Sequence, residues 1–149
     1  MKAIIQRVTA AYVVADGQLA GEIGKGLFIL LGVVHEDTQT DVEKLVGKIT
    51  RMRIFPDQQG KNNLSVSEVD GEALVVSNFT LAANCRKGNR PDYTEAAPPD
   101  QANQLYESFI AGLREVLVGR VECGVFGASM EISAQCHGPV TIVLDSREL

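Results

Sequence analysis

The first candidates for chemistry are four neighbouring residues: Ser77, Asn78, Phe79 and Thr80. They follow the apolar residues 73–76, whose paired valines are typical of a strand that is covered on both faces. A buried strand that ends in two hydroxyls, an amide and an aromatic ring has the groups needed for the floor of a pocket. The alternative is a structural role, in which the hydroxyls only satisfy backbone groups at the strand end.

Catalysis by an ordinary pair of side chains has no candidate elsewhere. The two histidines, His35 and His137, lie beside predicted strands with no third group to orient them. We expect His35 to be exposed at a strand end, and His137 either to belong to a turn or to face a ligand. The motifs of phosphate loops, dinucleotide-binding folds, zinc proteases and serine hydrolases are absent, and the carboxylates show no convincing pairing.

Length and composition exclude several classes of protein. The 149 residues, 45% hydrophobic and 22% charged, suit one globular domain with a sizeable core. The longest apolar run, residues 26–34, is too short to span a membrane, and no signal peptide is expected. Three widely spaced cysteines without a CxxC pair argue against a disulfide framework and a structural metal site. We expect one domain, residues 1–149, in reducing cytoplasm, with no metal, no cofactor and no membrane partner.

Four strands are predicted before the first helix, at residues 2–8, 10–14, 19–23 and 27–34, with a tight turn at Asp16-Gly17. Thr40 and Glu43 have the spacing of a capping box, and an apolar stripe at helical spacing follows. The second helix is predicted from an Asp100 N-cap to Gly119, again with one apolar face that includes Tyr106.

The last third of the chain returns to strands, at residues 120–123, 130–136 and 140–144. The alternation in residues 130–136 predicts a half-buried strand, and His137-Gly138-Pro139 predicts a turn. The whole pattern predicts one α/β (α+β) domain: a mostly antiparallel, barrel-like sheet with two covering helices.

Two further segments carry functional hypotheses. Residues 82–99 have no periodicity, hold three of the five prolines and include Arg86, Lys87 and Arg90. Such a loop is either functional or a solvated surface segment, and the net charge of −5 still allows an RNA substrate at one basic patch. The Gly138-Pro139 bond is expected to be trans on frequency alone. A cis bond there would turn backbone carbonyls to one side, as a rigid wall that selects ligands without a side chain.

Residues 77–81 (Ser-Asn-Phe-Thr-Leu) and 138–141 (Gly-Pro-Val-Thr) together resemble the motifs of the D-aminoacyl-tRNA deacylases. The resemblance covers essentially the whole chain and includes residues 5–8, 32–33, 53–55, 88–91 and 124–130. It implies a homodimer that hydrolyses the ester between a D-amino acid, or glycine, and the terminal adenosine of tRNA. The fold implied is the same sheet with two covering helices.

The resemblance also implies roles for individual residues. The segment 77–81 would form the pocket for the adenosine and the aminoacyl carbonyl, with backbone N–H groups near Phe79 and Thr80 stabilising the oxyanion. Thr80 is a nucleophile candidate in such a site, but the substrate's own ribose hydroxyl is the favoured group. A cis Gly138-Pro139 from the other subunit would cap the pocket and exclude an L side chain, with Arg7 supporting it.

The basic residues Arg86, Lys87 and Arg90 would then contact phosphates near the tRNA acceptor end. The alternative is that the Arg90-Pro91 pair is structural.

Three positions depart from the usual motifs. Asn78 stands where Gln is usual, Cys136 stands where Asn precedes the Gly by two positions, and Cys123 stands where Thr is common. Asn78 keeps the amide but shortens its reach, and Cys136 removes a hydrogen-bonding side chain beside the Gly-Pro wall. Two alternatives therefore stay open. One is a related tRNA editor with relaxed or L-amino-acid specificity, for which a trans Gly-Pro bond is the expected sign. The other is a non-catalytic module that binds tRNA ends or D-amino acids.

Overall fold

The sheet is built around β1 (Lys2–Ala15), in a computed structural model that describes residues 1–149. β1 pairs antiparallel with β2 (Gln18–Ile23), β3 (Gly26–Gly32) and β8 (Met130–Asp145). Two further strands, β6 (Glu72–Ser77) and β7 (Val121–Cys123), extend the sheet from β3 in parallel. The order is β2-β1-β3-β6-β7, with β8 also on β1, so the expected α+β fold is confirmed while the sheet is mixed.

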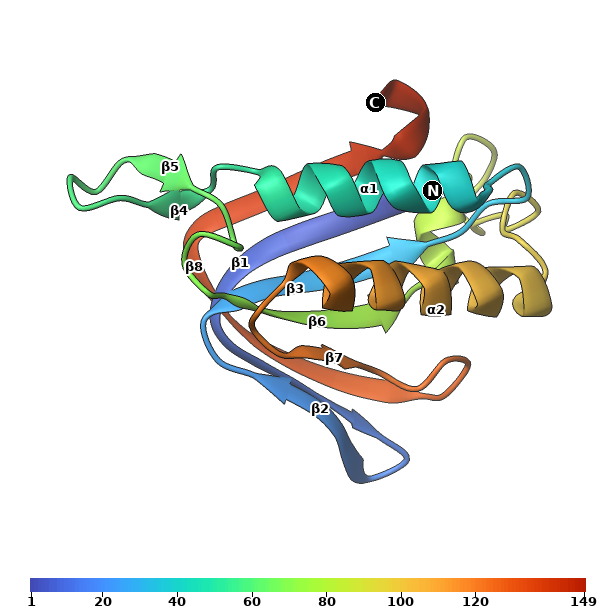
Figure 1. Cartoon of the computed structure of the whole chain (residues 1–149). Coiled ribbons are helices and arrows are strands. Elements are labelled where there is room, and N and C mark those ends of the chain that lie inside the picture. The colour runs from blue at the N-terminus through green and yellow to red at the C-terminus, as the bar shows by residue number, and fades with distance from the viewer.

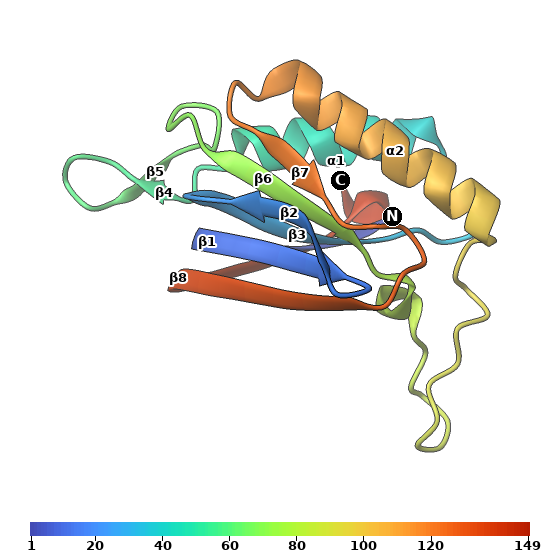
Figure 2. The same ribbon diagram turned by 90° about the horizontal axis from the view of Figure 1, so that it is seen from below.

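Two helices, α1 (Gln39–Arg51) and α2 (Pro99–Val116), lie side by side over one face of this sheet (Figures 1 and 2). Between them and the sheet is the main core, in which Ile29, Val75 and Phe109 are completely buried. The predicted apolar stripes are confirmed, because both helices bury the residues at that spacing. Neither helix is long and apolar enough to cross a membrane.

A second, smaller core lies on the other face, where β1 and β2 bend over β3 and β6. Phe28 and Leu74 belong to it, as do Val8 and Val13 of β1. The bend brings β2 back toward β7: a Cβ added to Gly21 would lie 3.1 Å from the carbonyl oxygen of Cys123. The sheet is therefore a nearly closed barrel without a hydrogen-bonded seam between β2 and β7.

The strand predicted at residues 27–34 ends at Gly32, and larger differences from the predicted strand boundaries lie at two other places. Residues 2–8 and 10–14 form the single strand β1, because irregular pairing around Val8 bends the strand without ending it. Likewise, the predicted turn at His137-Gly138-Pro139 lies inside β8. Gln6 pairs with Thr141 and Val8 pairs with Cys136, so the residues between them form a bulge in a continuous strand.

The prediction that residues 130–136 are half-buried was wrong. Residues 131–139 are exposed on both faces of β8, and Ile132 is 39% accessible. β8 is an edge strand with β1 on one side and no layer above or below this part of it (Figure 2). Alternation in the sequence identified the strand correctly, but burial depends on what covers each face.

The helix ends also differ from the prediction. The capping box of α1 joins Thr38 to Asp41, whose Oδ2 accepts hydrogen bonds from the Thr38 N–H at 2.9 Å and hydroxyl at 3.0 Å. α2 begins after the N-cap Pro98, with Asp100 in its first turn, and ends at Val116 rather than at Gly119. The chain that connects α1 to β6 forms a small hairpin of β4 (Phe55–Pro56) and β5 (Asn62–Leu64).

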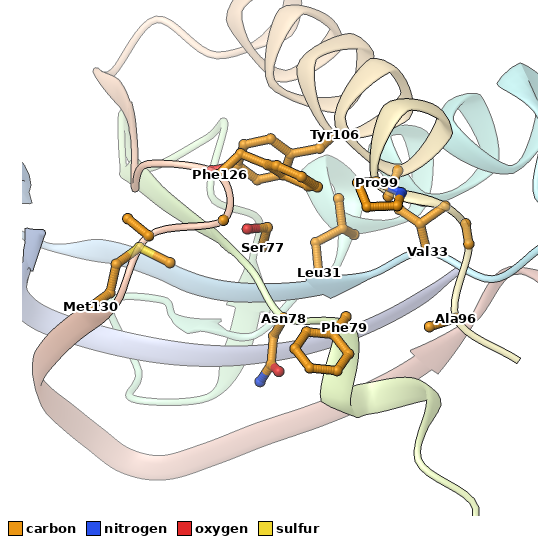
Figure 3. A pocket seen from close by; sticks show the side chains of 14 residues that line it. Leu31, Val33, Ser77, Asn78, Phe79, Ala96, Pro99, Tyr106, Phe126 and Met130 are labelled. Carbon is orange, nitrogen blue, oxygen red and sulfur yellow. The ribbon is translucent and has the colours of Figure 1, made fainter. Parts of the chain in front are cut away.

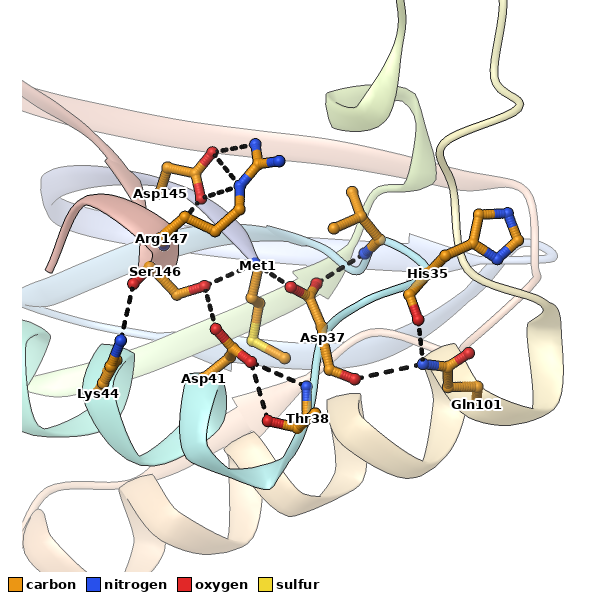
Figure 4. Close-up of polar contacts among 11 residues, drawn as sticks. Met1, His35, Asp37, Thr38, Asp41, Lys44, Gln101, Asp145, Ser146 and Arg147 are labelled. Carbon is orange, nitrogen blue, oxygen red and sulfur yellow. Dashed lines mark hydrogen bonds and ion pairs between the residues drawn. The ribbon is translucent and has the colours of Figure 1, made fainter.

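A buried polar network holds the start of β1 against the last turn, η2 (Ser146–Glu148) (Figure 4). The Met1 ammonium donates to Asp37 Oδ1 and, at 2.7 Å, to Ser146 Oγ. Ser146 Oγ donates to Asp41 Oδ1, and the other Asp37 oxygen accepts from the Val34 N–H, both at 2.7 Å. This network stabilises the loop between β3 and α1, which borders the site described next.

Candidate active site

The candidate site begins where β6 ends. Residues 73–76 are buried on both faces, as the apolar run predicted. The Asn78 N–H then donates to the Leu31 carbonyl of β3 at 2.8 Å, and the chain turns into the 3₁₀ helix η1 (Phe79–Ala82). Gly32 allows η1 to lie this close to β3, because a Cβ at Gly32 would lie 2.8 Å from the Cβ of Leu81.

Asn78 is the N-cap of η1. Its Oδ1 accepts hydrogen bonds from the Thr80 N–H at 3.1 Å and from the Thr80 hydroxyl at 2.5 Å. A short amide suits this geometry, because asparagine is among the best N-cap residues. Both polar groups of Thr80 are therefore engaged within the motif, and the Phe79 N–H is the donor that Asn78 leaves unoccupied.

A cavity of about 490 Å³ opens beside this strand end (Figure 3). Ten of its 14 lining residues are hydrophobic, as is usual for small-molecule sites. The 14 residues come from β3 and the residue after it, the end of β6 with the start of η1, the loop before α2, α2 itself, the 124–129 bend and β8. They are Leu31, Val33, Ser77, Asn78, Phe79, Ala96, Ala97, Pro99, Ala102, Tyr106, Phe126, Gly127, Ala128 and Met130. Figure 3 shows Ser77 facing the rings of Tyr106 and Phe126, and the Asn78 amide pointing away from them.

Tyr106 forms the back of the cavity. Its hydroxyl donates to the Val75 carbonyl at 2.9 Å and lies 3.5 Å from the carbonyl oxygen of Gly124. Burial raises the pKa of the Tyr106 phenol well above its ordinary value, so the group remains a neutral donor. Sequence reasoning placed Tyr106 in the core but missed its place in the site. The available signal was one phenol hydroxyl on an apolar helix face.

The predicted residues of the first motif only partly line the cavity. Ser77, Asn78 and Phe79 do, whereas Thr80 does not. Phe79 is 60% exposed at the mouth of the cavity, and its ring contacts Tyr93 edge to face. Phe126 and Met130, which were not predicted as site residues, complete the wall opposite η1.

Gly138 and Pro139 do not line the cavity of their own chain. They lie in the exposed bulge of β8, and the bond between them is cis. Arg7, only 6% exposed, fastens the base of this bulge: its Nε donates to the His137 carbonyl at 3.1 Å. A Cβ on Gly138 would lie 3.0 Å from Arg7 Nη2, so this glycine permits the close approach of the guanidinium. The structure thus joins Arg7 to the Gly-Pro segment and leaves both apart from Ser77.

The same guanidinium reaches the β4–β5 hairpin. Arg7 Nη1 donates to the Ile54 carbonyl at 2.5 Å and to Asn62 Oδ1 at 2.9 Å. All of these acceptors are neutral, and no carboxylate forms an ion pair with Arg7.

The predicted basic residues Arg86, Lys87 and Arg90 lie on the loop between η1 and α2, which extends away from the sheet (Figure 2). All three are exposed, none lines the cavity and none forms an ion pair. His35 is exposed at the end of the long apolar run, as expected, and one of its ring nitrogens lies 2.8 Å from the Thr94 carbonyl oxygen of this loop. No three side chains of His, Cys, Asp or Glu are grouped in a way that could hold a metal ion.

Comparison with known proteins identifies the family of the chain. Residues 4–145 match the model of the family described as D-Tyr-tRNA(Tyr) deacylase. The chain belongs to this family. A D-aminoacyl-tRNA deacylase of Persephonella marina is 50% identical over 149 residues, all of both chains, and that of Aquifex aeolicus is 49% identical over the same extent.

Solved structures agree on the fold. One titled "c-Myc DNA Unwinding Element Binding Protein" is 44% identical, with a TM-score of 0.92 over 97% of this chain and 98% of that one. Another, titled as a probable eukaryotic D-amino acid tRNA deacylase, is 15% identical with a TM-score of 0.84 over 96% and 97%. At that identity the second likeness shows only the fold.

Proposed function

We propose that this chain hydrolyses the ester bond of D-aminoacyl-tRNA, releasing free tRNA and the D-amino acid. The deacylase activity follows from the family to which the chain belongs. The observation that carries the assignment to this site is the cavity at the end of β6, whose wall includes Ser77, Asn78 and Phe79 of the first motif. The size and apolar lining of the cavity suit the terminal adenosine with its aminoacyl group. Glycine has no side chain for the site to exclude, so we extend the proposal to glycyl-tRNA mischarged on tRNA(Ala).

In the proposed mechanism the backbone, rather than an acid–base pair, assists the reaction. As water adds to the ester carbonyl, the Phe79 N–H stabilises the negative charge that develops on the carbonyl oxygen, and the ester bond to the ribose then breaks to release the amino acid and free tRNA. Thr80 is a poor nucleophile here, because its hydroxyl already donates to Asn78 and no base lies beside it. The substrate's own ribose hydroxyl is the group that remains to assist the attack.

Selectivity is proposed to come from a second subunit. Gly138 and Pro139 lie away from the cavity of their own chain, so they reach a pocket only if another copy presents them. The exposed strand β8 supports such a homodimer: Ile132 is 39% and Val143 72% exposed on it, and an open edge strand of this length favours a covering partner. A wall of backbone carbonyls from that partner would exclude an L side chain and accept hydrogen or a D side chain.

The loop cations complete the proposal. Arg86, Lys87 and Arg90 are free to contact phosphates of the tRNA acceptor end, in a contribution that does not depend on sequence. We place the reaction in the cytoplasm, where aminoacyl-tRNA is used in translation.

The test is hydrolysis of D-tyrosyl-, L-tyrosyl- and glycyl-tRNA by wild type and by Gly138→Ala. We expect the wild type to cleave the D and glycyl esters and to spare the L ester. In Gly138→Ala the new methyl would meet Arg7 Nη2 at 3.0 Å and the Val140 side chain at 2.9 Å, so the D-over-L preference is expected to fall at least tenfold. Gly60→Ala is the matched control, because Gly60 also has a positive φ, of +77°, but nothing within 4 Å of the added methyl.

Other outcomes identify the alternatives. Cleavage of L esters by the wild type would identify an editor with relaxed specificity, and a stable monomer in light scattering would refute the trans-acting wall. RNA binding by a folded dimer without any cleavage would identify the binding module. One observation favours that module: the relative that is 44% identical carries a title that describes nucleic-acid binding.

A further inference from the structure

Two exposed aromatic rings lie together at the mouth of the cavity. The ring centroids of Phe79 and Tyr93 are 5.1 Å apart, with an angle of 67° between the ring planes. Phe79 is 60% exposed and Tyr93 is 38% exposed, although neither belongs to a strand or to an α-helix face that needs covering. Phe79 lines the cavity and Tyr93 does not, so Tyr93 is the next aromatic surface outward from the pocket.

The backbone around Tyr93 is held on both sides. Asn84 and Asp92 exchange two backbone hydrogen bonds, of 2.7 and 3.0 Å, which close the loop just before Tyr93. On the other side, the Tyr93 carbonyl accepts from the Ala96 N–H at 3.0 Å, and the Ala97 N–H donates to the carbonyl of Val33, the residue after β3, at 3.0 Å. The aromatic surface is therefore fixed relative to the cavity, because the same short segment, through Ala96 and Ala97, also lines it.

The charges of this loop favour an anionic ligand beyond the ring. The exposed cations Arg86, Lys87 and Arg90 all lie within the segment that the Asn84–Asp92 pairing closes off. Two acids lie in the same loop: the Asp92 carboxylate accepts from the N–H of Thr94 at 2.9 Å and from its hydroxyl at 3.3 Å, and Glu95 lines the same small hollow as Arg86. Neither forms an ion pair with the three cations. The cavity is apolar, the ring beyond it is aromatic and exposed, and the loop beyond the ring carries cations. This order matches single-stranded nucleic acid, whose bases stack on aromatic rings while its phosphates contact cations.

We propose that Tyr93 is a stacking platform for the base immediately 5′ of the terminal nucleotide in the cavity. This rests on the proposed function, since it requires the terminal adenosine to occupy the cavity beside Phe79. All tRNAs end in CCA, so the stacked base is a cytosine, and stacking makes the subsite tolerant of the tRNA's identity. Tyr93 is thereby a residue that binds the substrate without touching the reacting ester.

The test compares three esters of D-tyrosine: D-tyrosyl-adenosine, D-tyrosyl-cytidylyl-adenosine and D-tyrosyl-tRNA. For the wild type, kcat/KM is expected to rise about tenfold when the cytidine is added, which is the scale of one base stacked on one ring. Tyr93→Ala is expected to lose this gain and to raise the KM for the tRNA ester by a similar factor, with kcat unchanged. Tyr93→Phe keeps the ring and is expected to retain the gain.

Three results would overturn the proposal. The first is an unchanged cytidine gain in Tyr93→Ala. The second is an equal loss on D-tyrosyl-adenosine, which would mean that Tyr93 only supports Phe79. The third is a wild type that is dimeric while Tyr93→Ala is monomeric, which would show that this ring is a contact between subunits. Binding of the uncharged trinucleotide CCA is measured in parallel. Tighter binding to wild type than to Tyr93→Ala would support the stack even if no ester were cleaved, so the subsite and the proposed reaction are tested separately.

Discussion

Tyr106→Phe removes one buried hydroxyl and keeps the ring that backs the cavity. The structure indicates a small cost at neutral pH, because the Val75 carbonyl that loses the phenol donor still accepts the Gly124 N–H at 2.9 Å. The Gly124 carbonyl loses only its long 3.5 Å contact with the hydroxyl, so the expected loss is about 1 kcal/mol of unfolding free energy, the net value of one hydrogen bond. Removing the ring as well, in Tyr106→Ala, is expected to cost about 3–5 kcal/mol, as for other large core aromatics.

The pH dependence makes this prediction sharper. Burial raises the pKa of the folded phenol above its ordinary value of 10.0, so only the unfolded chain ionises Tyr106 just above pH 10. Because the pKa is raised in the folded state, the contribution of Tyr106 to the unfolding free energy is complete below pH 10 and is lost as the pH rises above it. At pH 11 the wild type is expected to have lost about 1.4 kcal/mol through this group, one pH unit of linkage, which Tyr106→Phe cannot lose. The variant should therefore equal or exceed the wild type at pH 11.

Urea unfolding at pH 7 and pH 11, followed by circular dichroism, measures both numbers. Tyr12→Phe is the matched control at pH 7, because Tyr12 is 43% exposed and its loss is expected to change stability by less than about 0.5 kcal/mol. If the advantage of the wild type over Tyr106→Phe in unfolding free energy is the same, or larger, at pH 11 than at pH 7, the phenol is not buried in its neutral form at the back of the cavity.

Two further predictions concern the polar groups near the chain ends. Asp37→Asn should lower the unfolding free energy measured in urea titrations by about 2–3 kcal/mol. The buried Met1 ammonium would lose its charged partner, although the new amide could still accept one hydrogen bond. A loss below about 0.5 kcal/mol would contradict the buried ion pair. The Arg147 hydrogen bonds lower the pKa of Asp145 to about 2, so its contribution to stability is complete above about pH 5 and is lost as the pH falls through about 2. Asp145→Asn should therefore be less stable than wild type at pH 6, by up to about 1 kcal/mol for this partly exposed pair, and the gap in thermal midpoint should be less than about half as large at pH 2.5. A gap that is undiminished at pH 2.5 would show that the carboxylate's charge is not the cause.

Local sequence patterns predicted a structural feature correctly where that feature depends only on residues close together in the chain. The apolar residues 73–76 formed a strand covered on both faces, and the helical stripes became the buried faces of α1 and α2. The motif at residues 77–81 was recognised because the residue types are adjacent in the chain. The first helix start was misplaced by two residues, since Thr38 and Thr40 offer similar capping spacings and only the packing of the preceding loop, anchored by Asp37, selects between them.

Most element types, both motifs and, through the motifs, the family could therefore be predicted from neighbouring residues in the chain. Which residues meet in space depends on how the elements pack. The cavity is assembled from four stretches of the chain, residues 31–33, 77–79, 96–106 and 126–130, so the phenol of Tyr106 and the ring of Phe126 acquire a place in it only through packing. Whether the alternating strand at residues 130–136 is covered, and whether Gly138 reaches the cavity of its own chain, also depend on segments distant in sequence. Periodicity and turn residues depend on the conformation of a few consecutive residues. Burial and contacts between distant residues depend on how all the elements of the fold pack together.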